Sequence, residues 1–327
     1  MKVLVIGKTG GVTNWEPEVV AGLQAAGHQV EFRATRNPRI NPHIERLFLG
    51  RIADDINRRI DRLRPDLILA VSGWGIEPAI IERISARPNR PPLVGWVGDL
   101  FDETRVANLN RFDALGYTDT GLIAVHERLG LKPKCAFIPH AADLAIAAGL
   151  PQAAGPDQRR RQMLFVGNPT AQRRALIAAV RDPLALYGLG WADRQGVEHH
   201  DTHGRRIQRP QLARLYADHF ACLNIRNEHN VVDGLNQRNF SPLALGCAVV
   251  TDPQKDMSLC FDVSTEVLVY DSPAALNDLY REIIASPRLA YETGERGRQR
   301  VLADHTYDKR LQAFQRLLGL SHSASAA

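Results

Sequence analysis

Short apolar runs alternate with amphipathic stretches from the first residues of the chain. The run KVLVIG at 2–7 predicts a buried strand, and a second strand is predicted around Val30 and Phe32. Apolar residues between Ile44 and Leu63 recur at helical spacing. Further strands are predicted at 66–73, 92–99, 114–119 and 135–140. Continuous apolar runs that are each followed by a helix are typical of a parallel sheet covered on both faces.

A second alternating series follows a polar stretch. Residues 151–162, PQAAGPDQRRRQ, are rich in Pro, Gly and Arg and predict an interdomain linker. Strands are then predicted at 163–168, 184–190, 219–225, 247–252 and 266–271. We therefore expect an α/β fold of two tandem Rossmann-like, doubly wound domains. The expected limits are 1–150 and 163–304 for the domains, 305–320 for a C-terminal helix and 321–327 for a disordered tail.

Composition narrows the class of protein. The 327 residues are 44% hydrophobic and 24% charged, and no apolar run approaches the roughly 18 residues of a membrane span. The N-terminal strand is too short for a signal peptide, and the four cysteines show no metal-ligand spacing. We therefore expect a cytoplasmic protein with reduced cysteines. Ligands of such sheets bind beyond the carboxyl ends of the strands, which favours a cleft between the two domains.

The net charge of +5 comes mainly from small arginine clusters. Acidic residues are interspersed among them, so solvated helix faces are the favoured interpretation. Peripheral contact with an anionic membrane stays open as an alternative. Nucleic acid is not expected as a partner, because the arginines lack interleaved aromatic residues.

The loop after the first strand excludes two common cofactor motifs. It contains Gly10 and Gly11, but neither a Walker A pattern nor G-x-G-x-x-G is present. ATP hydrolysis and NAD chemistry both lose support, and no cofactor is expected.

A polar run stands directly before an apolar segment in the second half of the chain. Asn236, Arg238 and Asn239 precede a short predicted helix that Gly246 ends. Backbone N–H groups at a helix start favour an anion, and an arginine adds a two-pronged donor for phosphate. Arg226 precedes the same loop. The run therefore predicts a diphosphate site, with a capped helix and exposed polar residues as the alternative.

The same residues resemble a known family. NQRNFSPLALGCAVVTD at 236–252 is similar to the N-x-R-x-F-E-x-x-A-x-G-x-x-L-x-T-D stretch of the CgeB-like (spore-maturation type) glycosyltransferases, of the GT-B superfamily. The resemblance implies a nucleoside diphosphate-sugar donor in the cleft between two Rossmann-like domains, an unknown acceptor and no bound metal. It also implies that the donor is bound by Gly10, Gly167, Asn168, Arg173, Arg226, Asp233, Asn236, Arg238, Asn239 and Ser241.

One position departs from the family pattern. Ser241 stands where the family has a Glu that grips the ribose diol, and Asp233 is the polar residue paired with it. A hydroxyl cannot serve two adjacent OH groups as a carboxylate does. Either the ribose is held less firmly, or the donor's sugar offers one OH, as a deoxyribonucleotide does.

Catalytic candidates come from the first domain. Deprotonating an acceptor needs a general base, and GWVGDLFDE offers Asp99, followed by Glu103. A helix N-cap is the alternative role for Asp99. His140 could instead contact the donor phosphate or the acceptor, but a histidine satisfied in a loop is the favoured interpretation. The histidines of EHHDTHG at 198–204 are expected to form a surface loop without a metal.

The resulting hypothesis is a glycosyltransferase. A nucleotide-sugar epimerase on the same architecture and a non-catalytic binding protein derived from it are the alternatives, and the missing Glu keeps the latter open.

Overall fold

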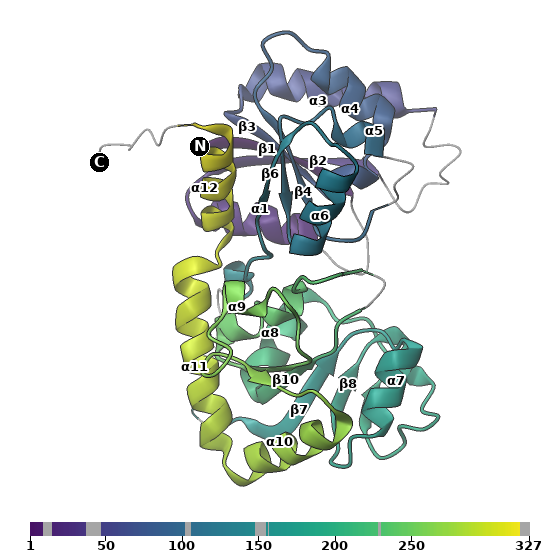
Figure 1. Ribbon diagram of the computed structural model, residues 1–327, viewed down its shortest axis with the longest axis vertical. Helices are drawn as coiled ribbons and strands as arrows, with labels where there is room; N and C mark the ends of the chain where they lie inside the picture. Colours follow the sequence, from purple (N-terminus) through teal and green to yellow (C-terminus); the bar gives the residue numbers. More distant parts are fainter. Residues whose placement is uncertain are drawn as a thin grey trace. The chain divides into compact units, whose positions relative to one another are not determined.

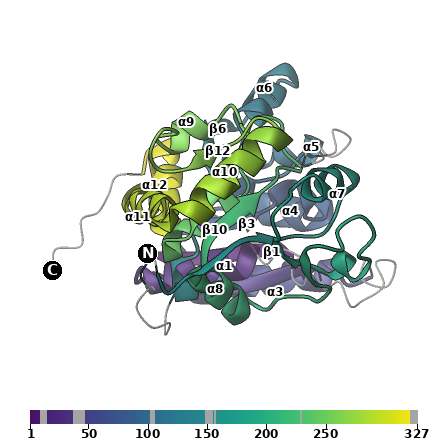
Figure 2. The same ribbon diagram turned by 90° about the horizontal axis from the view of Figure 1, so that it is seen from below.

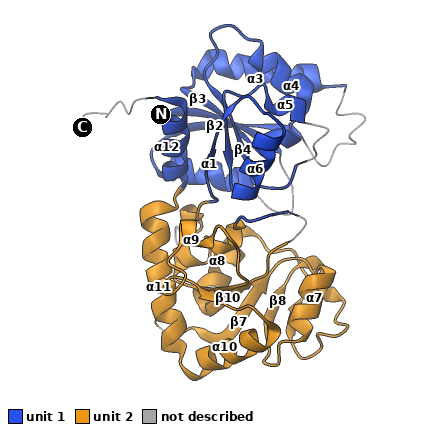
Figure 3. Ribbon diagram, viewed as in Figure 1, with its two compact units in different colours: residues 1–140, 228–234, 307–327 blue, residues 141–227, 235–306 orange. Residues whose placement is uncertain are grey.

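The structure, a computed structural model, describes residues 1–8, 15–36, 47–101, 106–147, 155, 157–227 and 230–320. The chain divides into two compact units (Figure 3). Of the described residues, unit 1 contains 1–140, 230–234 and 307–320, and unit 2 contains 141–227 and 235–306. The expected limit at residue 150 and the expected tail at 321–327 lie outside the described residues.

Unit 1 is built on a parallel sheet of six strands in the order β2-β1-β3-β4-β5-β6 (Figure 1). The strands are β1 (Lys2–Lys8), β2 (Gln29–Arg36), β3 (Leu67–Val71), β4 (Leu93–Val97), β5 (Ala114–Tyr117) and β6 (Lys134–Phe137). The helices are α1 (Trp15–Ala25), α3 (Leu49–Leu63), α4 (Pro78–Ser85), α5 (Val106–Leu109), α6 (Thr120–Arg128) and α12 (Tyr307–Leu318), with the 3-10 turn η1 (Gly73–Gly75).

Helices cover both faces of this sheet. Ile56 of α3 and Ile80 of α4 join the core on one face, together with Val97 of β4. On the other face, Trp96 of β4 meets Phe314 of α12 with ring centroids 6.0 Å apart. Successive residues of a strand point to opposite faces of the sheet. Because helices cover both faces, both sets of residues are apolar and the strands appear in the sequence as continuous apolar runs.

Unit 2 has a second six-stranded parallel sheet, in the order β12-β11-β10-β7-β8-β9. The strands are β7 (Arg160–Val166), β8 (Ala185–Tyr187), β9 (Asp201–His203), β10 (His219–Asn224), β11 (Ala248–Thr251) and β12 (Leu268–Val269). The helices are α7 (Ala171–Ala178), α8 (Arg209–Asp218), α9 (Met257–Cys260), α10 (Pro273–Ala285) and α11 (Pro287–Asp304). The 3-10 turns are η3 (Leu144–Ala147), η4 (Leu189–Ala192), η5 (Gln237–Asn239) and η6 (Leu243–Leu245).

Two core clusters flank the second sheet. Figure 2 shows α8 and α10 on opposite sides of β10. Tyr216 of α8 packs in the cluster that contains Leu164, whereas Tyr280 of α10 packs with Met163 and Phe165. Successive residues of β7 therefore serve opposite faces, as expected for a doubly wound sheet.

Two predictions about unit 2 need correction. Residues 160–162, predicted as linker, belong to β7, because Arg160 pairs with His219 and the buried Arg159 donates to the carbonyls of Leu245 and Gly246. The predicted surface loop of histidines contains strand β9, and His200 is buried. Both ring nitrogens of His200 bond to backbone, with Nδ1 accepting from Leu184 N–H and Nε2 facing the Ile177 carbonyl at 2.9 Å.

Candidate functional site

The central strands of unit 2 bring the predicted donor residues together. Strand order reverses between β7 and β10, which are neighbours in the sheet. Loops that leave such a switch point diverge and leave room for a ligand. Gly167 and Asn168 follow β7, and Arg226 follows β10.

Asn224, the last residue of β10, organises this edge of the sheet. Its side chain is buried, and its Nδ2 donates to Asn239 Oδ1 at 3.0 Å and to Thr251 Oγ1 at 3.2 Å. Its Oδ1 accepts from Asn236 Nδ2 at 3.0 Å and from Arg238 Nε at 3.3 Å. The sequence analysis missed Asn224, although an asparagine that closes the apolar run HFACL was a usable signal.

Arg173 reaches the same place from α7. Its Nη1 donates to Asn168 O at 3.2 Å and its Nη2 to Ile225 O at 3.0 Å, while its Nε is buried without a partner. Burial, and next the positive charge of Arg238, lower the pKa of Arg173 to about 10. Burial also lowers the pKa of Arg238. Two guanidinium groups that repel each other in a partly buried site favour an anion between them.

A carboxylate partly offsets this charge. Asp252 follows β11, accepts from Arg226 N–H at 3.0 Å and lies 3.6 Å from Arg226 Nε. Burial raises the pKa of Asp252, and Arg226 opposes that shift. Three arginines and one acid leave the cluster with net positive charge. Asp252 was also missed, because a polar residue after a strand is unremarkable in sequence.

The expected helix start needs correction. The segment forms two separate 3-10 turns, η5 and η6, and each has three residues. Asn236 caps η5 by accepting from Arg238 N–H at 2.9 Å, and Gly246 adopts φ 66°, which confirms the predicted stop. Turns this short have little dipole, so the positive charge at this loop comes from side chains.

Gly167 lies where backbones approach closely. Its carbonyl accepts from Trp191 Nε1 at 2.7 Å, and a Cβ on Gly188 would stand 2.3 Å from it. Trp191 is fully buried and Tyr187 nearly so, and the Tyr187 ring stacks on His203 with centroids 4.2 Å apart. Tyr187 is therefore a packing residue of this core.

Two further predicted donor residues, Ser241 and Asp233, do not join the network. Ser241 is buried at 7% exposure. Asp233 belongs to unit 1, where its N–H donates to the Asp119 carboxylate at 3.1 Å. Gly10 lies outside the described residues.

The catalytic candidates belong to unit 1. Asp99 follows β4 and accepts from Asn230 Nδ2 at 3.2 Å. Burial raises its pKa, against the opposing charge of Lys8. Glu103 lies outside the described residues, and residues 100 and 101 are not helical, so Asp99 does not cap a helix.

His140 differs from its expected role as a satisfied loop histidine. It is 7% exposed, and its Nδ1 has no hydrogen-bond partner. Burial and the charge of Arg310 lower its pKa to about 3. Its ring lies 4.7 Å from that of Trp15, centroid to centroid.

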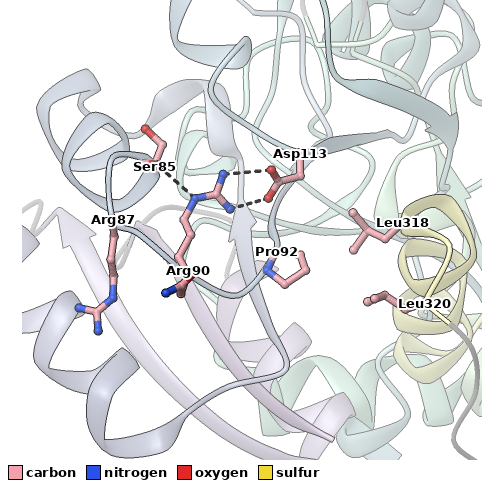
Figure 4. Close-up of a pocket in the computed structure, with 8 residues that line it drawn as sticks. Ser85, Arg87, Arg90, Pro92, Asp113, Leu318 and Leu320 are labelled. Carbon is pink, nitrogen blue, oxygen red and sulfur yellow. Dashed lines mark hydrogen bonds and ion pairs between the residues drawn. The ribbon is translucent and has the colours of Figure 1, made fainter.

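A separate pocket of about 490 Å³ lies elsewhere in unit 1 (Figure 4). Figure 4 shows Arg90 paired with Asp113 beside Pro92 and Leu318. Pro92 and Asp113 precede β4 and β5, so this pocket stands at the amino ends of the strands, away from the edge where ligands of such sheets bind.

The described residues contain no helix that is long and apolar enough to cross a membrane. In the same part of the chain, His, Cys, Asp and Glu side chains form no cluster of three or more that could hold a metal ion.

Comparison with known proteins agrees with this architecture. Residues 161–316 match the family described as glycosyl transferase-like. HepE of Anabaena, solved in complex with UDP and glucose, is 11% identical, with a TM-score of 0.68 over 98% of this chain and 99% of its own. The chain has the GT-B fold, and its residues 161–316 resemble the glycosyl transferase-like family.

Two further GT-B structures resemble it over their full length. The sucrose-phosphate synthase of Thermosynechococcus elongatus is 16% identical, with a TM-score of 0.67 over 98% of this chain and 100% of its own. A UDP-forming α,α-trehalose-phosphate synthase of Burkholderia xenovorans is 14% identical, with a TM-score of 0.63 over 99% of each chain. At the level of sequence, no curated protein matches.

Proposed function

We propose that the chain transfers a sugar from a nucleoside diphosphate-sugar to an acceptor hydroxyl, as a GT-B glycosyltransferase of the CgeB-like type. The observation that carries the proposal is the convergence of Arg173, Arg226 and Arg238 on the switch point of unit 2. HepE, with the same fold, was solved with UDP and with UDP-glucose, and this chain would bind a donor of that class.

The chemistry follows from where charge develops. The acceptor oxygen bonds to the anomeric carbon, the bond from that carbon to the diphosphate oxygen breaks, and negative charge grows on the diphosphate. Guanidinium groups fixed beforehand by Asn224 and by backbone carbonyls stabilise that charge without reorganising. Within the proposal they make a metal ion unnecessary, and chelation with EDTA should leave turnover unchanged.

Asp99 is the proposed proton acceptor for the acceptor hydroxyl. Burial raises its pKa toward neutrality, and a raised pKa makes a carboxylate a stronger base. Asn230 holds its Oδ1 and leaves the other oxygen to face a substrate. Glu103 remains the second candidate, as predicted from the sequence.

A thermal-shift series with nucleoside diphosphates and their sugars tests the proposal. A ligand at 100 times its dissociation constant should stabilise the fold by about 2.7 kcal/mol. Absence of any shift with every diphosphate would contradict the donor assignment. Product analysis with the best donor then separates the alternatives: an epimerase alters the donor without an acceptor, and a binding protein leaves it intact.

A further inference from the structure

The first sheet also has a switch point, and charged groups gather there. Strand order reverses between β1 and β3. Lys8 ends β1, and its Nζ lies 5.3 Å from the ring centroid of Trp74, which follows β3. A Cβ on Gly75 would stand 2.5 Å from that Nζ, so the glycine makes room for the ammonium group.

Glu16, which the sequence analysis did not select, folds back over the end of β1. Its Oε1 accepts from Lys8 N–H at 3.1 Å, and its Cγ lies 2.7 Å from where a Cβ on Gly7 would be. The side chain is buried at 8% exposure. Lys8 stabilises the charged forms of both Glu16 and Asp99, while the Asp99 charge raises the pKa of Glu16, after the larger effect of burial. The three groups therefore act on one another at the edge where ligands of parallel sheets bind.

Beside Gly98, the residue before Asp99, lie two polar atoms with no hydrogen-bond partner in the described part of the chain. Trp15 and His140 are 6% and 7% exposed, and neither Trp15 Nε1 nor His140 Nδ1 has a hydrogen bond. Both rings abut Gly98: a Cβ there would be 2.8 Å from a Trp15 ring carbon and 3.1 Å from His140 Cε1, the atom bonded to Nδ1. Buried polar groups are rarely left unsatisfied, and those that are mark places where a polar ligand or water completes the bonding.

Among the described side chains whose charges act on Glu16, Asp99 and His140, positive and negative groups are equal in number. Lys8 and Arg310 carry positive charge, Glu16 and Asp99 negative charge, and the Arg310 guanidinium donates to the His140 carbonyl at 2.7 Å. His140 is neutral near pH 7, since burial lowers its pKa to about 3. This contrasts with unit 2, where three arginines face a single carboxylate. An anionic ligand therefore gains little electrostatic stabilisation here, whereas hydroxyl groups can bond to both hydrogen-bond donors and acceptors.

We propose that this edge of unit 1 binds an uncharged, polyhydroxylated acceptor, such as a sugar or a sugar alcohol, and that Glu16 binds its hydroxyls beside Asp99. The inference rests on the proposed function and gives it an acceptor class. Two proteins of the same fold, sucrose-phosphate synthase and α,α-trehalose-phosphate synthase, are named for phosphate esters. A phosphorylated acceptor would meet the carboxyl groups of Glu16 and Asp99 here, and the charge of Lys8 already acts on both of them.

Saturation-transfer difference NMR on the full chain tests this with three matched pairs: glucose, fructose and mannitol, and their 6-phosphates, with UDP present. We expect contact with at least one neutral compound and at least tenfold weaker contact with its phosphate. The UDP signal reports the donor site independently. Its absence would count against the proposed function, whereas UDP contact without contact from any neutral compound would overturn the acceptor assignment alone.

Variants locate the site. Glu16→Gln should weaken binding of the neutral compound at least tenfold and leave the UDP signal unchanged. Glu18→Gln, a buried acid on the same helix near Tyr307, is the matched control and should change neither. The double variant Glu16→Gln, Asp99→Asn leaves Lys8 without its carboxylates, so it should bind the 6-phosphate more tightly than the wild type does. Equal effects of Glu16→Gln and Glu18→Gln, or no gain of phosphate binding in the double variant, would overturn the assignment.

Discussion

Arg238 is joined to Asn224 by a hydrogen bond of 3.3 Å from Nε to Oδ1. Since that bond engages only Nε, neither terminal nitrogen of Arg238 has a partner among the described residues. Asn224 is held in turn by Asn239 and Thr251. Asn224 therefore fixes the orientation of the Arg238 guanidinium through Nε, while the two terminal nitrogens are available to an anion.

Arg238→Ala should weaken the binding of a nucleoside diphosphate much more than the binding of the bare nucleoside. Hydrogen bonds to charged groups contribute roughly 1.5–3 kcal/mol, which corresponds to a loss of about tenfold or more. Isothermal titration calorimetry with UDP and with uridine measures both losses. Arg174→Ala is the matched control, because Arg174 donates to the carbonyls of Asp193 and Gln195 at the surface and should leave UDP affinity unchanged. Wild-type UDP affinity in Arg238→Ala would refute the donor site.

Asp99→Asn should lower turnover strongly and leave donor affinity near that of the wild type, as expected for a base that acts on the acceptor. A base works only when deprotonated, and burial raises the pKa of Asp99. An ordinary carboxyl group titrates near pH 4, so the acidic limb of the wild-type pH–rate profile should lie above pH 4. This limb should disappear in the variant. A variant that keeps most of its activity would move the role to Glu103.

Asp119→Ala should loosen residues 230–234. The Asp119 carboxylate accepts from the N–H groups of Val232 at 2.7 Å and of Asp233 at 3.1 Å. Removing charge-assisted acceptors worth roughly 1.5–3 kcal/mol should speed amide exchange at both positions by about tenfold or more. Hydrogen–deuterium exchange checks this, with Asp113→Ala, which removes a surface partner of Arg90, as the control. Unchanged exchange at Val232 would mean that other contacts hold the segment.

His140 should make the protein less stable as the pH falls. Its pKa is about 3 in the folded chain and about 6.5 in the unfolded one, so between these values the unfolded state binds more protons. Stability from this group is present above pH 6.5 and falls by about 1.4 kcal/mol per pH unit below it. Between pH 7.5 and pH 5, urea unfolding should show that the wild type loses about 2 kcal/mol more stability than His140→Phe does. Parallel curves would exclude the effect.

A deoxythymidine diphosphate-sugar should bind at least as well as its uridine counterpart. Ser241, in place of the family's Glu, offers one hydroxyl, and a site without the second partner loses little when the 2′-OH is absent. Competition binding with matched deoxy- and ribonucleoside diphosphates measures the difference. A tenfold preference for the ribo form, about 1.4 kcal/mol, would show that another residue grips the ribose.

Periodicity predicted the strands of both sheets well, because each of them except β2 and β9 carries an apolar run, and in β2 the apolar Val30 and Phe32 alternate with polar residues. The strand β9 was missed since Asp201, Thr202 and His203 form an edge strand with no such run. At the start of β7, charged residues concealed the strand: Arg159 is buried because three carbonyls accept its guanidinium, and no local pattern reveals partners as distant as Gly246.

The candidate site was predictable as far as residue types reveal chemistry. Arg238 and Asn236 could be selected from a polar run before an apolar segment. Asn224 and Glu16 could not be selected from the sequence, because their place in a site depends on which strand ends lie together in the fold. In the sequence, Asn224 ends an ordinary apolar strand, and Glu16 resembles any acidic residue in the first turn of a helix. Ser241 lies in the expected loop, yet its side chain is buried, which only packing determines.

The assignment of α12 to unit 1 sets the order in which the chain can be completed during synthesis. Phe314 packs against Trp96, and a Cβ on Gly116 would stand 2.6 Å from the Phe314 ring. The core around β4 and β5 therefore waits for the last helix to leave the ribosome, whereas unit 2 has all its residues once 306 is made. Of the two units, the one whose strands are translated first is therefore the last that can finish folding, and a nascent chain stalled before residue 307 would lack the helix that packs on Trp96.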